Sequence, residues 1–346
     1  MNNSILEHEI FEQPSVVSKL LINENGRVQK IAEDLKGKFE YILIAARGSS
    51  DNAARYAQYL FGKFNHLPVA LATPSLFTIY QQAPLLTGAL VIGISQSGQS
   101  PDIVQVIREA HKQKQPTIAI TNELKSPLAE SADHVINLHA GEEHAIAATK
   151  TYTASLTALA LLSAQLLGDK TRHIEMANLP AQMEDTFFLI KEQIIHIERY
   201  RYMEHCAVIG RGLNYATSYE IALKIKELTR IVAEPYSSAD FRHGPIAMVR
   251  EGFPMLIIAP TGEVSSDINE LIDELLHRKG ELILVSDDST VLAKAHLPFP
   301  IPKNVPEWLS PLVCVIPGQL FALHLARAKG FNPDNPQGIQ KITETF

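Results

Sequence analysis

The sequence predicts an α/β protein with two tandem, doubly wound parallel-sheet domains related by internal duplication. Short, continuous apolar runs alternate with segments of helical spacing along the 346-residue chain. Apolar strands separated by helices are typical of a parallel sheet that is covered on both faces. The strand-like runs of the second half also repeat those of the first at an offset of 164 or 165 residues, as 254–259 repeats 89–94. This shared offset predicts two copies of one unit.

The first copy contains five candidate strands, most of them separated by helix-like segments. An Arg-Gly turn, Arg47-Gly48, follows the first strand, and a helix is expected over 53–64. A long apolar helix over 148–168 closes the copy. The strands are expected at 41–46, 68–72, 89–94, 115–121 and 133–138.

The second copy repeats this order. A second Arg-Gly turn, Arg211-Gly212, follows its first strand, and a long helix over 309–329 mirrors 148–168. Two unrelated doubly wound domains would share similar strand spacing, but the repeated Arg-Gly turn favours duplication. The strand-like segments are expected at 207–212, 231–233, 254–259, 281–286 and 297–300.

These patterns define the expected domain organisation. An N-terminal domain covers 1–170, a helical connector covers 171–203, a C-terminal domain covers 204–330, and a C-terminal tail covers 331–346.

The composition is typical of a soluble protein of the cytoplasm. The chain has 46% hydrophobic residues and a net charge of −7, so it offers no basic field to nucleic acid or to an anionic membrane. Its two cysteines form no metal-binding or disulfide pattern, which suits a reducing compartment. The N-terminus lacks the features of a signal peptide. The most apolar stretch, 153–167, is shorter than a membrane span and predicts a buried helix.

The stretch Ser95–Ser100 has the pattern of a phosphate-binding loop. It follows the apolar strand 89–94 and precedes a helix that begins at Pro101. Such a turn presents backbone N–H groups and the positive end of a helix dipole to an anion. Three serine hydroxyls add donors, and the stretch contains no lysine or arginine. The sequence therefore predicts an uncharged cradle for one phosphate group.

The second copy lacks this loop. Its corresponding turn, 260–264, contains Glu263, whose charge would repel a phosphate. We therefore expect one phosphate site in each chain.

Charged residues in the second copy are candidates for catalysis. Glu220, Lys224 and Glu227 lie on one face of a helix over 219–228, because they are spaced at i, i+4 and i+7. A charged stripe of this kind is also typical of a solvated helix face. His243 precedes a Gly-Pro turn, and an isolated histidine is often only structural.

Together these motifs resemble the double SIS-domain family of sugar isomerases. The resemblance is closest to the isomerase half of the glucosamine-6-phosphate synthases and to the deaminases built on that half, and it covers nearly the whole chain. The Ser-Gln-Ser-Gly loop marks only the superfamily, whereas the Lys-x-x-Glu helix followed by the His-Gly-Pro turn is far more specific. The matching segments are 8–14, 47–50, 95–102, 147–153, 210–212, 222–227, 242–245 and 335–341.

The resemblance implies a set of substrate-binding residues. Ile146 and Ala148 match positions that touch the sugar, although Ala148 stands where a serine is usual in the synthases. The residues implied to hold the sugar phosphate are Ser50, Ser95, Gln96, Ser97 and Ser100.

The resemblance also implies the catalytic groups. Glu227 is the expected base that moves a proton between C1 and C2, and Lys224, one turn away, orients its carboxylate. His243 is expected to assist ring opening from a neighbouring subunit, which implies a homodimer. Lys341 is expected on a tail folded over the sugar, where it contacts the carbonyl end or forms an imine. A carboxylate base and a histidine that titrates near neutral pH suit this chemistry.

The expected reaction is the hydrolysis of glucosamine 6-phosphate to fructose 6-phosphate and ammonia. The synthase family carries an N-terminal glutaminase domain that begins with a nucleophilic cysteine, whereas this chain begins Met1-Asn2 and enters the isomerase pattern by His8. Isomerase residues without an ammonia source favour the degradative direction.

Three alternatives remain open at this point. Galactosamine 6-phosphate differs only at C4, and a fructoselysine-type 6-phosphate would need similar residues in a wider pocket. A non-catalytic sugar-phosphate sensor would need the loop but not Glu227 and His243. We expect no metal, and no dinucleotide cofactor, because Gly210-x-Gly212 lacks the third glycine of that fingerprint.

Overall fold

The computed structural model describes residues 4–341, which form two compact units. Of the described residues, the N-terminal unit comprises Ser15–Glu143, Lys150–Ala177 and, from the end of the chain, Gln340 and Lys341. The C-terminal unit comprises 4–14, the loop His144–Thr149, and Asn178–Ile339. The units are thus interleaved in sequence, whereas the expected domains were continuous. The last residues of the expected tail, 342–346, lie outside the described residues.

The N-terminal unit is built on a five-stranded parallel sheet with the order β2-β1-β3-β4-β5. Every strand coincides with one of the expected apolar runs, and β3 is buried along its whole length. The strands are β1 (Tyr41–Ala45), β2 (Val69–Leu71), β3 (Ala89–Ile94), β4 (Thr117–Thr121) and β5 (His134–Asn137).

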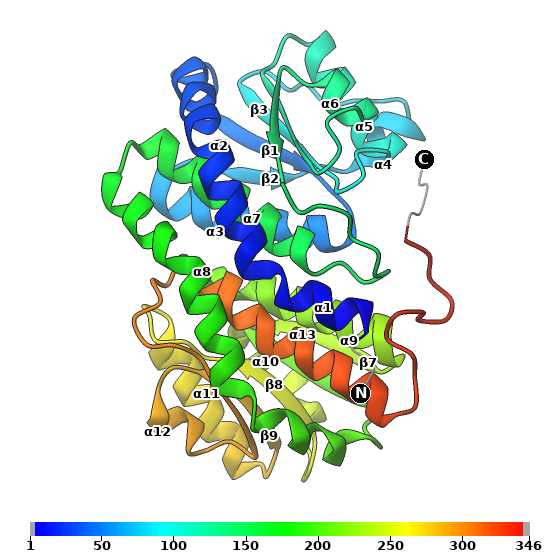
Figure 1. Cartoon of the computed structure of the whole chain (residues 1–346), viewed down its shortest axis with the longest axis vertical. Helices are drawn as coiled ribbons and strands as arrows, with labels where there is room; N and C mark the ends of the chain where they lie inside the picture. The colour runs from blue at the N-terminus through cyan, green and yellow to red at the C-terminus, as the bar shows by residue number, and fades with distance from the viewer. Residues whose placement is uncertain (1–3, 342–346) are drawn as a thin grey trace. The chain divides into compact units, whose positions relative to one another are not determined.

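Helices cover both faces of this sheet (Figure 1). On one face, side chains of α4 (Pro74–Thr78), α5 (Pro101–Lys112) and α6 (Pro127–Ser131) share a core with β1 and β3. On the other face, α3 (Gly48–Asn65) packs against α7 (Lys150–Leu167), and α2 (Gln13–Leu35) lies nearby. Nearly all of α7 is buried, as the sequence predicts for this apolar helix.

The C-terminal unit repeats this architecture. Its parallel sheet has the order β10-β9-β8-β6-β7, which is the order of the first sheet when read from the other edge. The prediction of two doubly wound α/β domains is therefore confirmed. The strands are β6 (His205–Gly210), β7 (Val232–Ser237), β8 (Pro254–Ile258), β9 (Glu281–Ser286) and β10 (Leu297–Pro300).

Helices also cover both faces of the second sheet. On one face of the sheet, α9 (Tyr215–Thr229) packs along α13 (Ser310–Ala328). Side chains of α10 (Ser238–Arg242), α11 (Ser265–His277) and α12 (Ser289–Leu292) share a core with β6, β8 and β9. The expected helical connector is present as α8 (Lys170–Ile190) and the 3₁₀ segment η1 (Gln193–Tyr200).

Helix α13 is the one helix in residues 4–341 that is long and apolar enough to cross a membrane. However, 83% of its apolar window is buried inside the fold. This burial is that of a core helix.

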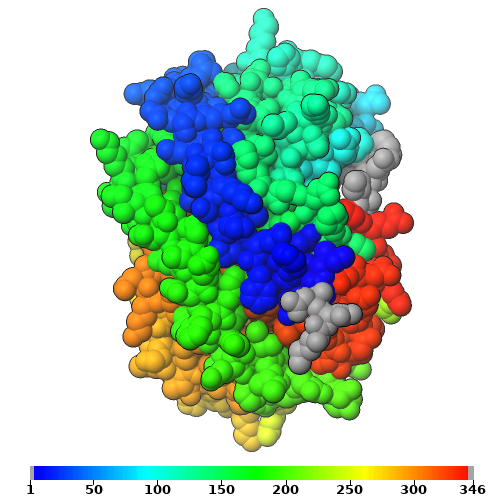
Figure 2. All heavy atoms as spheres, viewed as in Figure 1, coloured from blue at the N-terminus to red at the C-terminus, as the bar shows by residue number. Residues whose placement is uncertain are grey.

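Helix α1 (Ile5–Phe11) belongs to the C-terminal unit and packs against α13. Arg327 of α13 pairs with Glu7, with 2.7 Å between Nη2 and Oε2. Gln13 donates from Nε2 to Oε1 of Gln319 over 2.8 Å, and both side chains are buried. Figure 2 shows the dark blue N-terminal helix lying against the orange-red C-terminal residues. Tertiary packing thus joins the start of the chain to a helix more than three hundred residues away.

Candidate active site

The predicted phosphate loop lies at the switch point of the first sheet. The chain order reverses between β1 and β3, which are direct neighbours, with Ala45 opposite Gly93. Ligands of open α/β sheets bind at the carboxyl ends of strands where this reversal occurs. The turns Arg47–Ser50 and Ser95–Ser100 follow these two strands, so the topology brings both to one edge of the sheet.

The hydroxyl groups of the loop lie close together. Ser95 Oγ accepts a hydrogen bond from the Gly98 N–H over 3.2 Å and lies 3.4 Å from Ser100 Oγ. Ser97 Oγ accepts one from the Gln99 N–H over 3.3 Å. Ser100 is the residue before the first turn of α5, whose dipole favours an anion here. The hydroxyls of Ser95 and Ser100 thus lie together at the start of α5, and the binding of a phosphate there stays a prediction.

Gly98 is required by the shape of this loop. Its φ is +62°, and a Cβ added to it would lie 2.1 Å from Ser126 Oγ. Only glycine fits such a position without strain or displacement.

An arginine on the neighbouring turn is held by a carboxylate. Arg47 Nε lies 2.8 Å from Oδ2 of Asp102, whose side chain is fully buried in the first turn of α5. The carboxylate of Asp102 compensates the positive charge of Arg47. The ion pair also links the turn 47–50 to the start of α5, which follows the loop Ser95–Ser100. The sequence pattern gave Asp102 no role.

In the second copy, carboxylates of the chain itself occupy the corresponding turn. The N–H of Thr261 donates to Asp287 Oδ1 over 2.7 Å, and the N–H of Glu263 donates to Glu307 Oε1 over 3.2 Å. The Glu263 side chain, which we expected to repel phosphate, is exposed. The acidic groups that fill this turn therefore come from Asp287 and Glu307.

The charged stripe of α9 is buried, so the interpretation as a solvated face is wrong. Lys224 is 1% exposed, and its Nζ lies 2.6 Å from Glu227 Oε2 and 3.4 Å from Glu220 Oε1. Glu220 is fully buried, whereas Glu227 is 23% exposed. One ammonium thus serves two carboxylates, of which only Glu227 is accessible to a ligand. A carboxylate held in this way on a rigid helix can act as a base.

His243 lies at the end of α10 and is exposed. Its N–H donates to the Asp240 carbonyl over 3.1 Å, and the following Gly244 has a φ of +142°. In the part of the chain that the structure describes, no hydrogen bond or ion pair joins its ring to Glu227. The imidazole is therefore presented outward from its own unit.

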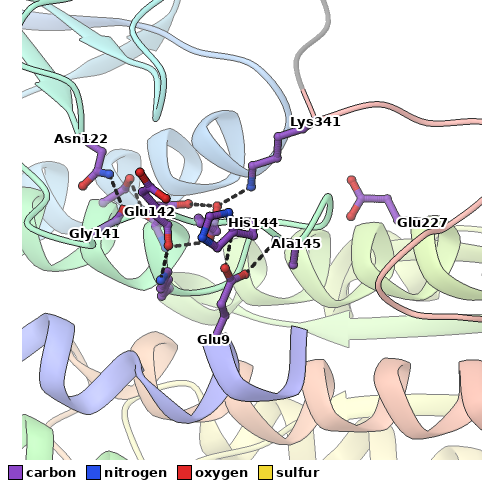
Figure 3. A network of polar contacts seen from close by, with 12 residues as sticks. Glu9, Asn122, Gly141, Glu142, His144, Ala145, Glu227 and Lys341 are labelled. Atoms are coloured by element: carbon purple, nitrogen blue, oxygen red, sulfur yellow. Dashed lines mark hydrogen bonds and ion pairs between the residues drawn. The ribbon is translucent and has the colours of Figure 1, made fainter. Parts of the chain in front are cut away.

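Lys341 is paired with a carboxylate that sequence reasoning missed. Its Nζ lies 2.8 Å from Oε2 of Glu143, a buried side chain of the same unit (Figure 3). The N–H and Oγ1 of Thr151 donate to the two oxygens of Glu143 over 3.2 Å and 2.8 Å. In the sequence, the one sign that Glu143 matters is its position, three residues before Ile146. The contact holds the ammonium of Lys341 on the Glu143 carboxylate.

The two residues expected to contact the sugar lie in the C-terminal unit. Ile146 and Ala148 are half-buried in the loop His144–Thr149, which belongs to the C-terminal unit together with Lys224, Glu227 and His243. The N-terminal unit carries Lys341 and the predicted phosphate-binding residues. No three His, Cys, Asp or Glu side chains are grouped to hold a metal ion within residues 4–341.

Comparison with known proteins agrees with this architecture. The SIS domain model matches residues 38–164 and 201–328. The glutamine–fructose-6-phosphate aminotransferase [isomerizing] of Pyrococcus horikoshii is 35% identical over 339 residues, which are 96% of this chain and 56% of that protein. The chain therefore spans about half the length of such relatives.

Solved structures show the same fold over nearly the whole chain. The C-terminal domain of glucosamine-fructose-6-phosphate aminotransferase from Francisella tularensis superposes with a TM-score of 0.87 at 29% identity, covering 96% of this chain and 98% of that one. A glucosamine-6-phosphate deaminase from Thermotoga maritima has a TM-score of 0.78 at 23% identity, covering 99% and 100%. The two matches of the domain model cover most of the sequence, and this chain therefore belongs to the SIS-domain family.

Proposed function

We propose that this chain converts glucosamine 6-phosphate and water to fructose 6-phosphate and ammonia. The observation that carries the proposal is the Glu227 carboxylate, which is partly exposed and ion-paired with the buried Lys224. A non-catalytic sensor of sugar phosphates would have no use for such a pair. The names of the aminotransferase relatives also point to amino-sugar phosphates.

In this proposal, the phosphate is bound by the hydroxyl and N–H groups of Ser95–Ser100, with Ser50 on the adjacent turn. Binding energy from the phosphate, remote from the reacting carbons, orients C1 and C2. His243 of a neighbouring subunit assists ring opening to the aldehyde. Lys341 then contacts the open carbonyl end.

Glu227 performs the proton transfer. It removes the proton from C2 to give a C1–C2 enolamine, and it returns that proton to C1 to give the ketimine. The ion pair with Lys224 keeps the carboxylate oriented. Water then adds to the ketimine carbon, the C–N bond breaks, and fructose 6-phosphate and ammonia are released.

The two cysteines of this chain are not candidates for the catalytic groups of the proposed reaction. Both Cys206 and Cys314 are buried, and burial raises the pKa of Cys206 to about 12 and that of Cys314 well above its usual value. A thiol with a raised pKa is a poor nucleophile.

An ammonia-release assay tests the proposal. Purified protein is incubated with glucosamine, galactosamine and fructoselysine 6-phosphates. The released amine (ammonia from the first two, lysine from the third) and the sugar 6-phosphate formed in each case are measured. We expect release from glucosamine 6-phosphate, with Glu227→Gln losing about 10²–10⁴-fold in kcat while still binding the sugar phosphate. Release from another substrate would reassign the specificity, and no release from any of the three would refute the reaction.

A Lys226→Gln variant is the matched control. Lys226 is exposed on the same helix, next to Glu227 but directed elsewhere. Its turnover should equal that of the unaltered protein. An equal loss in both variants would mean that the effect comes from the helix and not from the Glu227 carboxylate.

A further inference from the structure

Glu9, in the N-terminal helix α1, binds the backbone of the loop that carries Ile146 and Ala148. The N–H of His144 donates to Oε1 of Glu9 over 2.5 Å, and the N–H of Ala145 donates to Oε2 over 3.2 Å (Figure 3). Glu9 is only 4% exposed. All three residues belong to the C-terminal unit. The carboxylate thus accepts from two consecutive amides, one with each oxygen.

This arrangement is a strong, directional constraint. A buried carboxylate that accepts N–H bonds is held by charge-assisted hydrogen bonds, and successive N–H groups form a concave site suited to an anion. Two oxygens on two amides fix both the position and the rotation of the peptide that follows Glu143. The backbone at 144–145 therefore has one favoured arrangement.

The helix that carries Glu9 is itself anchored. Glu7 pairs with Arg327 over 2.7 Å, and the N–H of Leu6 donates to Asp334 Oδ1 over 2.9 Å. Because both contacts hold the turn of α1 that precedes Glu9, Glu9 acts from a fixed support. The segment 8–14, which the resemblance matched without assigning a role, contains this residue.

We call the two hydrogen bonds from the His144 and Ala145 amides to Glu9 the clamp. The clamp lies directly before the positions that are expected to contact the sugar. Ile146 is the next residue after Ala145, and Ala148 follows two residues later. A rotation of the peptide at 144–145 would shift both side chains. On the preceding side, Asn122 Nδ2 donates to the Gly141 carbonyl over 2.7 Å, so the chain is fixed there as well.

We infer that Glu9 is a positioning residue for substrate binding, which holds Ile146 and Ala148 against the sugar through the amides of His144 and Ala145. This inference rests on the proposed function, because it assigns these side chains to the sugar of that substrate. Its structural part, the clamp on the loop, can be tested without turnover.

The first experiment compares Glu9→Gln with the unaltered protein by hydrogen exchange. A glutamine has the same shape, but it replaces one acceptor by an NH₂ group that faces an N–H. We expect faster exchange at the amides of 144–149 and unchanged exchange in β3 and β8. Glu12→Gln is the matched control, because Glu12 also belongs to the α1 end but is more exposed, near His8. Equal protection of the loop in both variants would overturn the clamp.

The second experiment separates sugar contact from phosphate contact. In Glu9→Gln, KM for glucosamine 6-phosphate should rise about tenfold or more while kcat changes less, because misplaced contacts weaken binding. The Kd of inorganic phosphate, which would use only the Ser95–Ser100 loop, should stay the same. A loss of phosphate affinity equal to the rise in KM would overturn the positioning role in favour of general destabilisation.

Two further measurements separate a failure of the proposed reaction from a failure of the inference about Glu9. If the unaltered protein releases no ammonia, affinity for 2-amino-2-deoxyglucitol 6-phosphate replaces KM, so the proposed reaction can fail while the clamp stands. If Glu9→Gln does not fold, Glu9→Asp, which keeps the charge but shortens the reach, should show faster exchange at the amides of 144–149 than the unaltered protein. Unchanged exchange in Glu9→Asp would then refute the clamp.

Discussion

Lys224 Nζ lies 2.6 Å from Glu227 Oε2 inside helix α9, and the lysine is 1% exposed. A buried ammonium is stable only when carboxylates compensate its charge, and Glu220 supplies the second one. The Glu220–Lys224–Glu227 chain therefore couples the stability of α9 to the orientation of the proposed base.

Removing this ammonium should destabilise the protein. Lys224→Met removes the ammonium that compensates the charge of the fully buried Glu220, so we expect a loss of about 3–5 kcal/mol in the free energy of unfolding. The double variant Lys224→Met/Glu220→Gln removes both charges and should recover part of that loss. Urea unfolding of the single and double variants measures this. Equal stability of the two would show that Glu220 does not depend on Lys224.

The phosphate loop should not tolerate a side chain at Gly98. In Gly98→Ala, the new Cβ would meet Ser126 Oγ, so the loop must shift, at a cost of about 1–3 kcal/mol. We expect weaker binding of inorganic phosphate, measured by calorimetry. Gly37→Ala is the control, because Gly37 also has a positive φ, +73°, but nothing lies within 4 Å of its Cβ. Comparable phosphate affinity in both variants would place the anion elsewhere.

Two inactive variants should complement each other if His243 acts in a neighbouring subunit. Glu227→Gln and His243→Ala each lose activity alone. In a mixed two-fold dimer, one site then contains both defects and the other contains neither, so random mixing should restore about a quarter of the normal rate. Turnover after joint unfolding and refolding measures this. If the mixture stays as inactive as its components, His243 acts within its own chain or not at all.

Acidification should weaken the packing of α1 on α13 through His324. Burial lowers the pKa of His324, and the nearby Arg327 lowers it further, while Glu7 opposes them. The unfolded chain, with a histidine pKa near 6.5, therefore takes up the proton before the folded chain does. Stability is complete above that pH and falls as the pH drops through the window below 6.5.

The pKa of Glu7 extends this effect to lower pH. Burial raises the pKa of this carboxyl, but the hydrogen bond and charge of Arg327 outweigh it and the net shift is downward. Its stabilising contribution is present above the unfolded pKa and is lost as the pH falls through the folded one.

The His324→Gln variant tests the contribution of the histidine. Its loss of unfolding free energy between about pH 7 and pH 5, measured by urea unfolding, should be smaller than in the unaltered protein. An equal loss in the two proteins would contradict this.

Much of the fold was predictable because its signals are local. The ten strands coincide with apolar runs, since a parallel strand buried on both faces must be apolar along its length. The observed strand ends differ from the expected ones by a few residues. Strand β7, for example, continues to Ser237, beyond the expected 231–233. The added residues include Glu234 and Pro235, so they do not read as an apolar run. This is because β7 is an edge strand and is only partly buried.

The candidate site was predictable only in part. The hydroxyl-rich loop after β3 and the Lys-x-x-Glu spacing of α9 are visible as patterns, but the spacing does not show whether the stripe is solvated. Burial of Lys224 and Glu220 is decided by α13, which packs along α9 from a distant part of the chain.

The sequence by itself determined the two copies, their strand order along the chain and the position of the single phosphate-type loop. Only the tertiary structure decided that α1 and the loop 144–149 belong to the C-terminal unit, that Glu9 binds the amide of His144, and that Glu143 pairs with Lys341. The physical reason is that periodicity reports which faces are apolar, whereas a carboxylate finds its amide or ammonium partner through space. Glu9 and His144 are 135 positions apart, and the sequence between them carries no local sign of their contact.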